Sequence, residues 1–294
     1  MAVVTAHHFT DPACPWAYSA RPAHARLAWR FGDQIEWRLV LIGLSESAEA
    51  YEARGYTPAL NAMGQRTFER RFGMPFAFRV KARMAGTARA CRAIVAAREL
   101  APELGEAALQ ALQLMHFTTP GLLDVDDDLR RALAAVDGLD AEAVVARIDD
   151  PAVVEAYERD RAYARSAEGS PTHAQGRFAT TDGPVRFTAP SVIFEHADGG
   201  RQEVGGFQPF EAYDTALANL DPRLDRRPPP GSVAEALSEF PRGLSTAEVA
   251  AVMRPSDLVD ADQHATAEQL AAAAGEGTVT AEPAGGDAIW RAAG

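Results

Sequence analysis

Cysteine is scarce in this sequence, and long apolar runs are absent. Cys14 and Cys91 are the two cysteines in 294 residues, which excludes a disulfide-stapled scaffold and is typical of a reducing compartment. No run of about 18 apolar residues occurs, so no transmembrane helix is expected. The N-terminus has no basic region followed by an apolar core, so no secretory signal is expected. The sequence therefore predicts a cytoplasmic protein with reduced thiols and no membrane partner.

Basic residues are outnumbered by acidic ones. The chain has 29 Lys and Arg against 41 Asp and Glu, which gives a net charge of −12. This balance argues against binding to nucleic acid or to an anionic membrane. No group of His, Cys, Asp and Glu has metal-ligand spacing, and no glycine-rich phosphate loop occurs, so no metal is predicted. A hydrophobic content of 47% is ordinary for a globular protein. The length of 294 residues suffices for one large domain or for two to three smaller ones.

The most informative stretch is residues 11–18, Asp-Pro-Ala-Cys-Pro-Trp-Ala-Tyr. An apolar run precedes it and an apolar, arginine-containing segment over residues 18–31 follows, which predicts a strand, a tight turn and a helix. Cys14 then lies at the first turn of the helix, and Pro15 occupies a position that needs no amide donor. Free N–H groups and the positive end of the helix dipole would favour the thiolate of Cys14. The alternative is a small buried cysteine in a loop.

This stretch resembles the DsbA-like branch of the thioredoxin fold. That branch includes FrnE-like oxidoreductases, 2-hydroxychromene-2-carboxylate isomerases, kappa-class glutathione transferases and mycothiol-dependent reductases. The redox members carry Cys-Pro-Trp-Cys, whereas Ala17 stands at the fourth position here. Without a second cysteine the local disulfide cannot form, so thiol chemistry would be monothiol. The resemblance implies a catalytic site at Cys14, Pro15 and Trp16, with no bound cofactor and a low-molecular-weight thiol, glutathione or mycothiol, as co-substrate.

The order of elements also fits this fold. Residues 34–43 read as a second strand, 190–195 and 201–204 as a hairpin, and 209–220 as a closing helix. Residues 45–165 have almost entirely helical periodicity, and 169–188 read as a loop. We therefore predict an α/β, thioredoxin-like domain over residues 1–44 and 185–222, interrupted by a large all-helical insertion and loop over residues 45–184.

The remaining residues are expected to form a separate small module. Residues 223–231 contain three consecutive prolines and read as a semi-rigid linker. Residues 232–294 read as three helices and a β-hairpin, which outline a winged-helix-like module. Three basic and ten acidic side chains give this module a net charge of −7, so DNA binding is disfavoured. We expect it to serve in packing, dimerisation or as a lid.

Further site residues follow from the resemblance. In thioredoxin-like folds a cis-proline beside the active cysteine opens a strand, and Pro190 matches that position. The Ala189 peptide would then bind the substrate or a thiol conjugate. The alternative is a trans proline at the start of an edge strand. Tyr18, with Trp16, would line the entrance to the site.

Cys91 and the two histidines of the first strand can each be interpreted in two ways. Cys91 lies within a predicted helix and is either a small core residue or a resolving thiol that meets Cys14, which requires Cα atoms within about 7 Å. His7 and His8 end the first strand; one of them could lie near Cys14 and lower its pKa, or be held in an ordinary hydrogen bond.

The sequence thus predicts a cytoplasmic, DsbA/FrnE-like thiol-dependent oxidoreductase that acts on a small-molecule or thiol substrate through Cys14. The resemblance also allows a homodimer through the helical insertion. The alternative function is a non-catalytic, thioredoxin-like binding protein that has lost redox activity, which the presence of Ala17 favours. A redox-sensing regulator that uses the C-terminal module on DNA is a third, weaker hypothesis.

Overall fold

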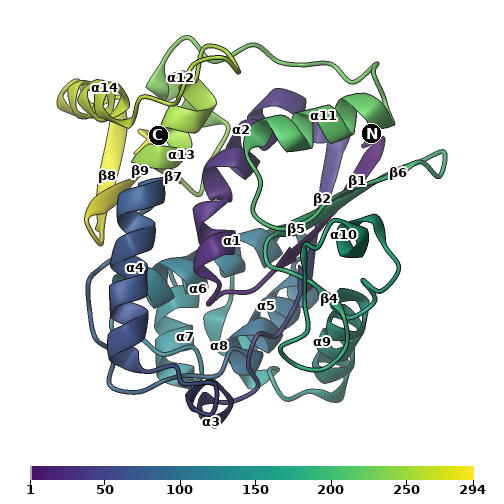
Figure 1. The fold of residues 1–294 in the computed structure, drawn as a ribbon. Coiled ribbons are helices and arrows are strands. Elements are labelled where there is room, and N and C mark those ends of the chain that lie inside the picture. The colour runs from purple at the N-terminus through teal and green to yellow at the C-terminus, as the bar shows by residue number, and fades with distance from the viewer. Residues whose placement is uncertain (1) are drawn as a thin grey trace.

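A four-stranded mixed sheet forms the centre of the protein, for which a computed structural model describes residues 2–294. β1 (Val4–Thr10) pairs in parallel with β2 (Ile35–Leu41) and antiparallel with β5 (Ser191–His196), and β5 pairs antiparallel with β6 (Arg201–Val204). The strand order is β2-β1-β5-β6 (Figure 1). The sheet therefore combines strands from two distant parts of the chain, as the thioredoxin-like prediction requires.

The first crossover contains two helices instead of the single helix that we predicted. α1 (Pro15–Ser19) ends at Ala20, and α2 (Arg21–Phe31) starts at the next residue. Pro22 lies in the first turn of α2 and lacks the N–H that would continue the α1 hydrogen-bond ladder, which accounts for the break.

Both faces of the sheet are covered. α2 and α11 (Phe210–Leu220) pack their buried side chains against Val4 and Phe194 on one face. On the other face Ile193 packs with Ala164 at the end of α9 (Pro151–Ala164). The sheet is thus buried on both sides, which explains why β5 begins with four consecutive buried residues.

Helices dominate the segment between β2 and β5, as predicted. They are α3 (Ala48–Glu52), α4 (Pro58–Phe72), α5 (Ala88–Leu100), α6 (Gly105–Thr118), α7 (Asp126–Leu133), α8 (Ala141–Ala146), α9 and α10 (Pro171–Ala174). Residues 73–87 contain no helix and form an irregular segment between α4 and α5. The predicted loop 169–188 contains α10 and a two-stranded ribbon, β3 (Phe178–Ala179) with β4 (Arg186–Phe187). α5 is the buried centre of the insertion, and its residues Ala90, Ile94, Val95 and Ala97 are fully buried.

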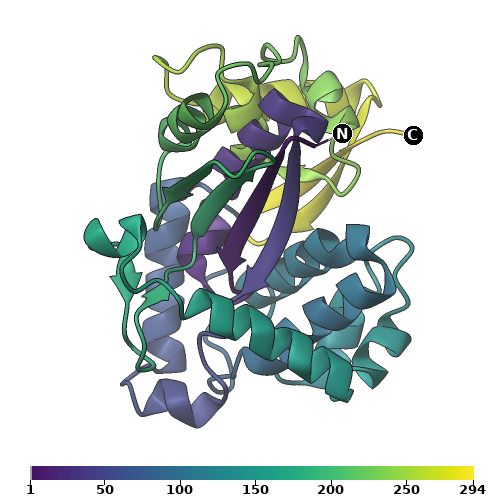
Figure 2. The same ribbon diagram turned by 90° about the vertical axis from the view of Figure 1, so that its right-hand side faces the viewer.

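The C-terminal module has three helices and a three-stranded sheet. In chain order these are α12 (Val233–Ser238), β7 (Leu244–Ser245), α13 (Thr246–Met253), α14 (Gln263–Gly275), β8 (Val279–Ala284) and β9 (Asp287–Ala292), with strand order β7-β9-β8. Ser245 and Glu248 form a complete capping box at the start of α13. In Figure 2 the yellow-green module lies at the top and the teal helices of the insertion at the bottom. The module nevertheless contacts the insertion, because the Gly286 N–H donates to the Phe76 carbonyl and the Gln110 side chain of α6 donates to the Gly243 carbonyl, both at 3.2 Å.

The module packs directly onto α2. Ala25 and Trp29 of α2 belong to the hydrophobic core of the module, whereas Leu27 and Phe31 of the same helix belong to the sheet core. α2 is therefore buried from two sides and lies between two separate hydrophobic cores, that of the module and that of the thioredoxin-like sheet.

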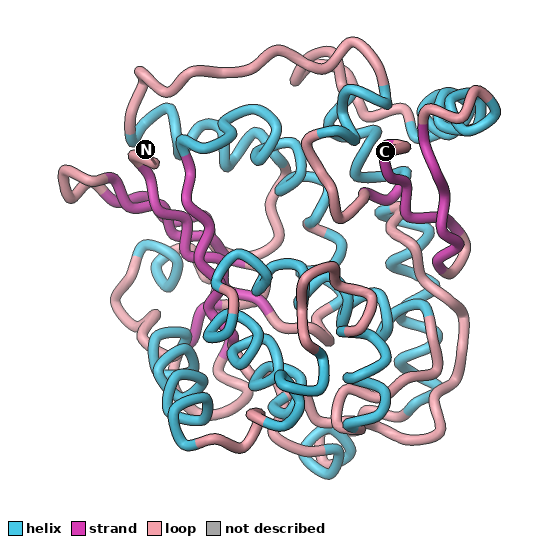
Figure 3. Tube along the Cα trace, turned by 180° about the vertical axis from the view of Figure 1, so that it is seen from behind, coloured by secondary structure: helices cyan, strands magenta, loops and turns pink. Residues whose placement is uncertain are grey.

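The proline-rich linker is fixed to the protein surface. It passes over the top of the molecule in Figure 3. The Trp29 indole N–H donates to the Pro228 carbonyl at 2.8 Å, and the Arg227 N–H donates to the Arg30 carbonyl at 2.8 Å. The Arg227 guanidinium also lies 3.6 Å from the centroid of the Trp29 ring. These contacts hold the segment against α2, so it does not act as a free spacer.

Candidate functional site

Cys14 lies where the sequence placed it, at the N-cap of α1 with Pro15 at the first helical position. Its S–H donates to the Ala189 carbonyl at 3.2 Å, and the Ala189–Pro190 peptide bond is cis, as expected. The Cys14 N–H donates to the Asp11 carbonyl at 3.1 Å, which closes the turn between β1 and α1. The structure therefore brings the Cys14 sulfur and the loop before β5 into direct contact.

Burial outweighs the expected stabilisation of the Cys14 thiolate by the helix N-terminus. Burial raises the pKa of Cys14 to about 12, because the charged sulfur would lose its hydration. The backbone N–H groups of Ala17 and Trp16 and the Arg186 guanidinium lower this pKa, while the Asp11 carboxylate raises it. The side chain is only 5% exposed, so burial outweighs the helix N-terminus and Cys14 is a thiol at neutral pH.

A cavity of about 1000 Å³ opens beside Cys14; we call it the Cys14 cleft. In Figure 1 α4 stands on one side of α1 and the β3–β4 ribbon on the other, and both contribute to its lining. Trp16 is 39% exposed at its edge and packs edge-on against Phe68 and Phe207, with ring centroids 4.8 and 5.5 Å away. Ala189 lines the cleft with Cys14. The cleft thus has an apolar, aromatic side next to the sulfur.

The charged side chains in the cleft lining are all basic. Among residues 2–294, those that line it include seven basic side chains and no acidic one. The basic residues come from the start of the helical insertion and from the segment before β5: Arg54, Arg71, Arg79, Lys81, Arg83, Arg177 and Arg186. We did not predict these residues, although the signal exists in the sequence: residues 54–92 hold nine basic side chains and a single acidic one.

Tyr18 does not line the entrance, contrary to our expectation. Its side chain is fully buried, its ring stacks on Phe117 with centroids 4.6 Å apart, and its hydroxyl donates to the Pro75 carbonyl at 3.0 Å. α1 directs this side chain into the insertion, so Tyr18 joins α1 to α6 as a core residue.

Cys91 lies behind the site in the core of the insertion. It is fully buried, and its S–H donates to the Asp11 carboxylate with a sulfur–oxygen distance of 3.6 Å. The same carboxylate accepts from the backbone N–H groups of Ala13 and Leu44 and from the Thr87 hydroxyl. Burial raises the pKa of Asp11. Cys91 thus fits the core interpretation, and Asp11, which we did not single out, organises the turn beneath Cys14.

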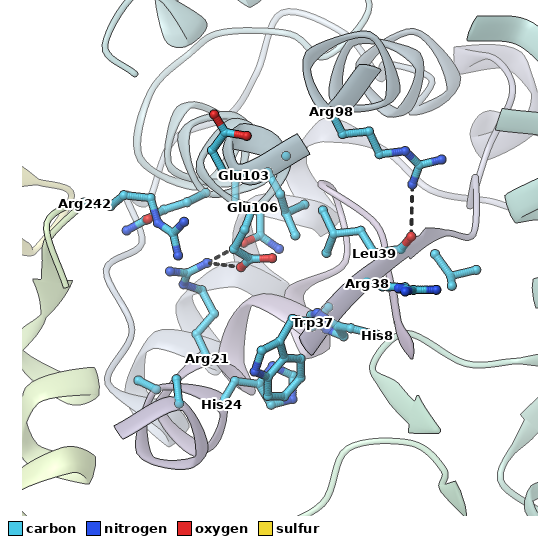
Figure 4. A pocket seen from close by; sticks show the side chains of 18 of the residues that line it. His8, Arg21, His24, Trp37, Arg38, Leu39, Arg98, Glu103, Glu106 and Arg242 are labelled. Atoms are coloured by element: carbon cyan, nitrogen blue, oxygen red, sulfur yellow. Dashed lines mark hydrogen bonds and ion pairs between the residues drawn. The ribbon is translucent and has the colours of Figure 1, made fainter. Parts of the chain in front are cut away.

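The two strand-end histidines lie away from Cys14. They line a second cavity, of about 760 Å³, next to the edge strand β2 (Figure 4); we call it the β2 cavity. His7 lies 3.2 Å from the Glu195 carboxylate. His8 is buried against His24 and Trp37, and burial, followed by the nearby Arg21 charge, lowers the pKa of His8 to about 3.

Arg21 joins three parts of the chain in the β2 cavity. Its guanidinium lies 2.9 Å from the Glu248 carboxylate of the module and 3.6 Å from the Glu106 carboxylate of α6. Figure 4 shows Arg21 and Glu106 facing each other, with Arg242 of the module beside them. Residues 232–294 contribute to this cavity and none of them lines the Cys14 cleft. The module is therefore not a lid over Cys14.

Two other features bear on the class of site. Within residues 2–294 no group of three or more His, Cys, Asp or Glu side chains is arranged to hold a metal ion. A membrane-spanning helix was also not found in that range, since none is both long and apolar enough.

Comparisons with known proteins agree with the fold. The chain is 24% identical over 250 residues to the ClpXP adapter protein SpxH of Shouchella clausii. The aligned region covers 83% of this chain and 76% of SpxH. The cytosolic disulfide reductase DsbM of Pseudomonas aeruginosa superposes with a TM-score of 0.52 at 20% identity, over 74% of this chain and 98% of DsbM. DsbM has also been solved with GSH.

A probable DsbA oxidoreductase of Streptomyces coelicolor superposes with a TM-score of 0.52 at 23% identity, over 75% of this chain and 91% of that protein. These structures show a shared fold. The sequence match to the DSBA-like thioredoxin domain covers residues 5–183, which include the Cys14 motif and nearly all of the helical insertion. The chain belongs to the DSBA-like thioredoxin domain family.

Proposed function

We propose that the protein is a thiol-dependent oxidoreductase that acts through Cys14 alone and forms mixed disulfides with a low-molecular-weight thiol. The observation that carries this proposal is the position of the Cys14 sulfur, which lines a cleft of about 1000 Å³ and lies 3.2 Å from the Ala189 carbonyl. A cleft of this size accommodates a small-molecule thiol. The solved complex of DsbM with GSH supports this class of co-substrate.

The chemistry needs one cysteine. The Cys14 sulfur attacks one sulfur of a disulfide R–S–S–R, the S–S bond breaks, and a Cys14–S–S–R bond forms. The proton that leaves Cys14 is taken up by the released thiolate, which leaves as R–SH. A second thiol then attacks the mixed disulfide, returns a proton to Cys14 and leaves as the new disulfide.

The resting thiol limits the rate of the first step. Because burial raises the pKa of Cys14 to about 12, a small fraction is thiolate at neutral pH, and attack requires loss of the proton now donated to Ala189. The free state of both cysteines is consistent with the cytosol, where we place the protein as part of this proposal.

The test uses one cysteine at a time. The Cys91→Ser protein, which retains Cys14, is incubated with a small disulfide at pH 9, and its whole mass is measured. We expect a single adduct of one thiol, released on addition of a reductant. The Cys14→Ser protein, which retains the buried Cys91, is the matched control and should stay unmodified. Absence of an adduct on the Cys91→Ser protein, or equal adducts on both, would contradict the proposal.

A second candidate function is non-catalytic binding. It is favoured by the raised pKa of Cys14, by Ala17 in place of a second cysteine, and by the similarity to SpxH, which is named as an adapter protein. Under this alternative the Cys91→Ser protein forms no adduct with any small disulfide, and Cys14 titrates near its raised pKa.

A further inference from the structure

The charge of the Cys14 cleft is opposite to the charge of the protein. The chain has a net charge of −12, yet seven basic residues and, among residues 2–294, no acidic residue line the cleft. A cleft with charges of one sign concentrates ligands of the opposite sign.

Two of the seven are neutralised by the protein itself. Arg83 forms a two-pronged pair with Asp124, with distances of 2.7 and 2.9 Å. Arg186 donates to Asp182 at 3.0 Å. Lys81 donates to the Thr119 carbonyl at 3.1 Å and also to the Gly121 carbonyl. These three side chains have fixed partners, so they do not by themselves indicate a ligand.

The other four basic residues have no carboxylate partner in the described part of the chain. The Arg54 guanidinium donates to two backbone carbonyls, and Arg71 lies over the rings of Trp16 and Phe72. Neither an ion pair nor a hydrogen bond from the side chain of Arg79 or Arg177 occurs within residues 2–294. Four solvent-exposed arginines therefore line the cleft without a carboxylate partner in the described part of the chain.

These four arginines come from separate segments. Arg54 follows α3, Arg71 lies in the last turn of α4, Arg79 belongs to the irregular segment 73–87, and Arg177 precedes β3. All four are exposed, so water and salt screen their mutual repulsion, but the sum of their charges still attracts an anionic ligand to the cleft. Guanidinium groups pair in a two-pronged way with both phosphate and carboxylate, which makes arginine well suited to such a ligand.

We infer that the thiol bound in the Cys14 cleft is a polyanion, a small molecule that carries several phosphate or carboxylate groups as well as its sulfur. This inference rests on the proposed function, since it names the class of thiol that Cys14 meets. The sulfur end would lie at Cys14 and Ala189 beside the aromatic edge at Trp16. The anionic groups would lie toward Arg79 and Arg177.

The experiment compares disulfides that differ in charge. The Cys91→Ser protein is incubated with coenzyme A disulfide, oxidised glutathione, hydroxyethyl disulfide and cystamine, and adduct formation on Cys14 is timed by mass spectrometry. Coenzyme A disulfide carries phosphates, oxidised glutathione carries carboxylates offset by amino groups, hydroxyethyl disulfide is neutral and cystamine is cationic. After correction for the intrinsic reactivity of each disulfide toward a free thiol, we expect at least one of the anionic compounds to react about tenfold faster than the neutral one. We expect cystamine to be the slowest, and the anionic advantage to shrink in high salt.

A matched pair of variants assigns the effect to the cleft. In the protein with both Arg79→Gln and Arg177→Gln, the corrected rate with the anionic disulfide should fall about tenfold, to near the rate with the neutral disulfide. Arg66→Gln with Arg70→Gln removes the same charge from α4 at two residues that do not line the cleft, and should retain most of the advantage.

The outcomes separate this inference from the proposed function. Equal corrected rates for all four disulfides would overturn the inference and leave monothiol chemistry intact, whereas no adduct from any of them would overturn the proposed function. Reaction with the disulfide of an acidic cysteine-containing peptide alone would also overturn the inference, in favour of a protein substrate.

Discussion

Charged side chains line both cavities of this protein, but they are partnered differently. In the β2 cavity Arg21 lies against Glu248 and Glu106, Arg38 against Glu36, and Arg98 against Asp160. Arg242 has no ion pair within residues 2–294, but the nearby Glu106 and Glu248 charges act on it. In the Cys14 cleft Arg54, Arg71, Arg79 and Arg177 have no carboxylate partner within residues 2–294. The β2 cavity also contains six acidic lining residues, whereas the described lining of the cleft contains none.

This difference separates two uses of charge. Pairs that are complete within the protein hold elements together, as Arg21 does for α2, α6 and the C-terminal module. Arginines without a carboxylate partner, such as those near Cys14, are instead available to bind an anionic ligand. We therefore expect mutations in the β2 cavity to change stability and mutations in the Cys14 cleft to change ligand chemistry.

The largest expected effect is the loss of the Glu248 charge. Glu248→Gln replaces the carboxylate 2.9 Å from the largely buried Arg21 guanidinium by a neutral amide and leaves Glu106 at 3.6 Å as the remaining carboxylate. It also weakens the α13 capping box, in which Glu248 accepts from Ser245. We expect the free energy of unfolding to fall by about 3 kcal/mol, measured by urea denaturation. Glu282→Gln, which breaks an exposed pair with Arg291 in the same module, is the control and should change it by less than about 0.5 kcal/mol. Equal effects of both substitutions would contradict the structural role of Arg21.

The next effect depends on pH. His8 has a folded-state pKa of about 3, lowered by burial from 6.5, so between these values the unfolded state binds a proton that the folded state does not. Stability is therefore fully present above pH 6.5 and falls as the pH drops toward 3. Between pH 7 and 4.5 we expect His8 to account for a loss of about 2–3 kcal/mol, which His8→Gln should remove.

The exposed His264 of α14 provides the control for this prediction. The loss of stability between pH 7 and 4.5, measured by urea denaturation at each pH, should be the same in His264→Gln as in the parent protein. A His8→Gln protein with an unchanged pH dependence would mean that His8 is protonated in the folded state.

A smaller effect concerns the reactivity of Cys14. The Asp11 carboxylate, after burial, is a cause of the raised pKa of Cys14. Asp11→Asn removes that negative charge, so the pKa of Cys14 should fall and its alkylation at pH 9 should accelerate by up to about tenfold, measured in the Cys91→Ser protein. Asp33→Asn, at an exposed position, should leave the rate unchanged. Slower alkylation in a folded Asp11→Asn protein would be incompatible with this account.

The smallest expected effect is on the stability of the cleft variants. Arg79 and Arg177 make no ion pair within the described residues, so replacing both by Gln should change the free energy of unfolding by less than about 0.5 kcal/mol. A destabilisation comparable to that of Glu248→Gln would show that these arginines are structural and would remove the difference between the two cavities.

The parts of the site that depend on local sequence could be predicted. Pro15 sets the start of α1, which fixes Cys14 at the N-cap. The position of Pro190 directly before β5, read through the family resemblance, predicted the cis Ala189–Pro190 peptide bond. The β1–β2 crossover and the β5–β6 hairpin have local signals and were predicted, whereas the antiparallel pairing of β1 with β5 joins segments that are far apart in the sequence and was not.

The parts of the site that depend on long-range packing could not be predicted from the sequence. The raised pKa of Cys14 comes from burial, which the motif alone does not specify. Tyr18 is buried because Pro75 and Phe117, far along the chain, close over it. The three consecutive prolines led us to expect a spacer. They carry no signal for the contacts with Trp29 and Arg30 that hold the linker in place. The charge of the cleft could be predicted only in part. The excess of basic residues over 54–92 is visible in the sequence, but which of these residues line the cleft is not.

The most direct test of the central claim is protection of Cys14 by a polyanion. The Cys91→Ser protein is treated at pH 9 with methyl methanethiosulfonate, an uncharged reagent, with and without pyrophosphate at constant ionic strength, and modification of Cys14 is followed by mass. We predict that pyrophosphate slows the modification in this protein and has little effect when Arg79 and Arg177 are also replaced by Gln. Equal rates with and without pyrophosphate, or equal protection in both proteins, would contradict the claim that the unpaired arginines make the Cys14 cleft an anion site.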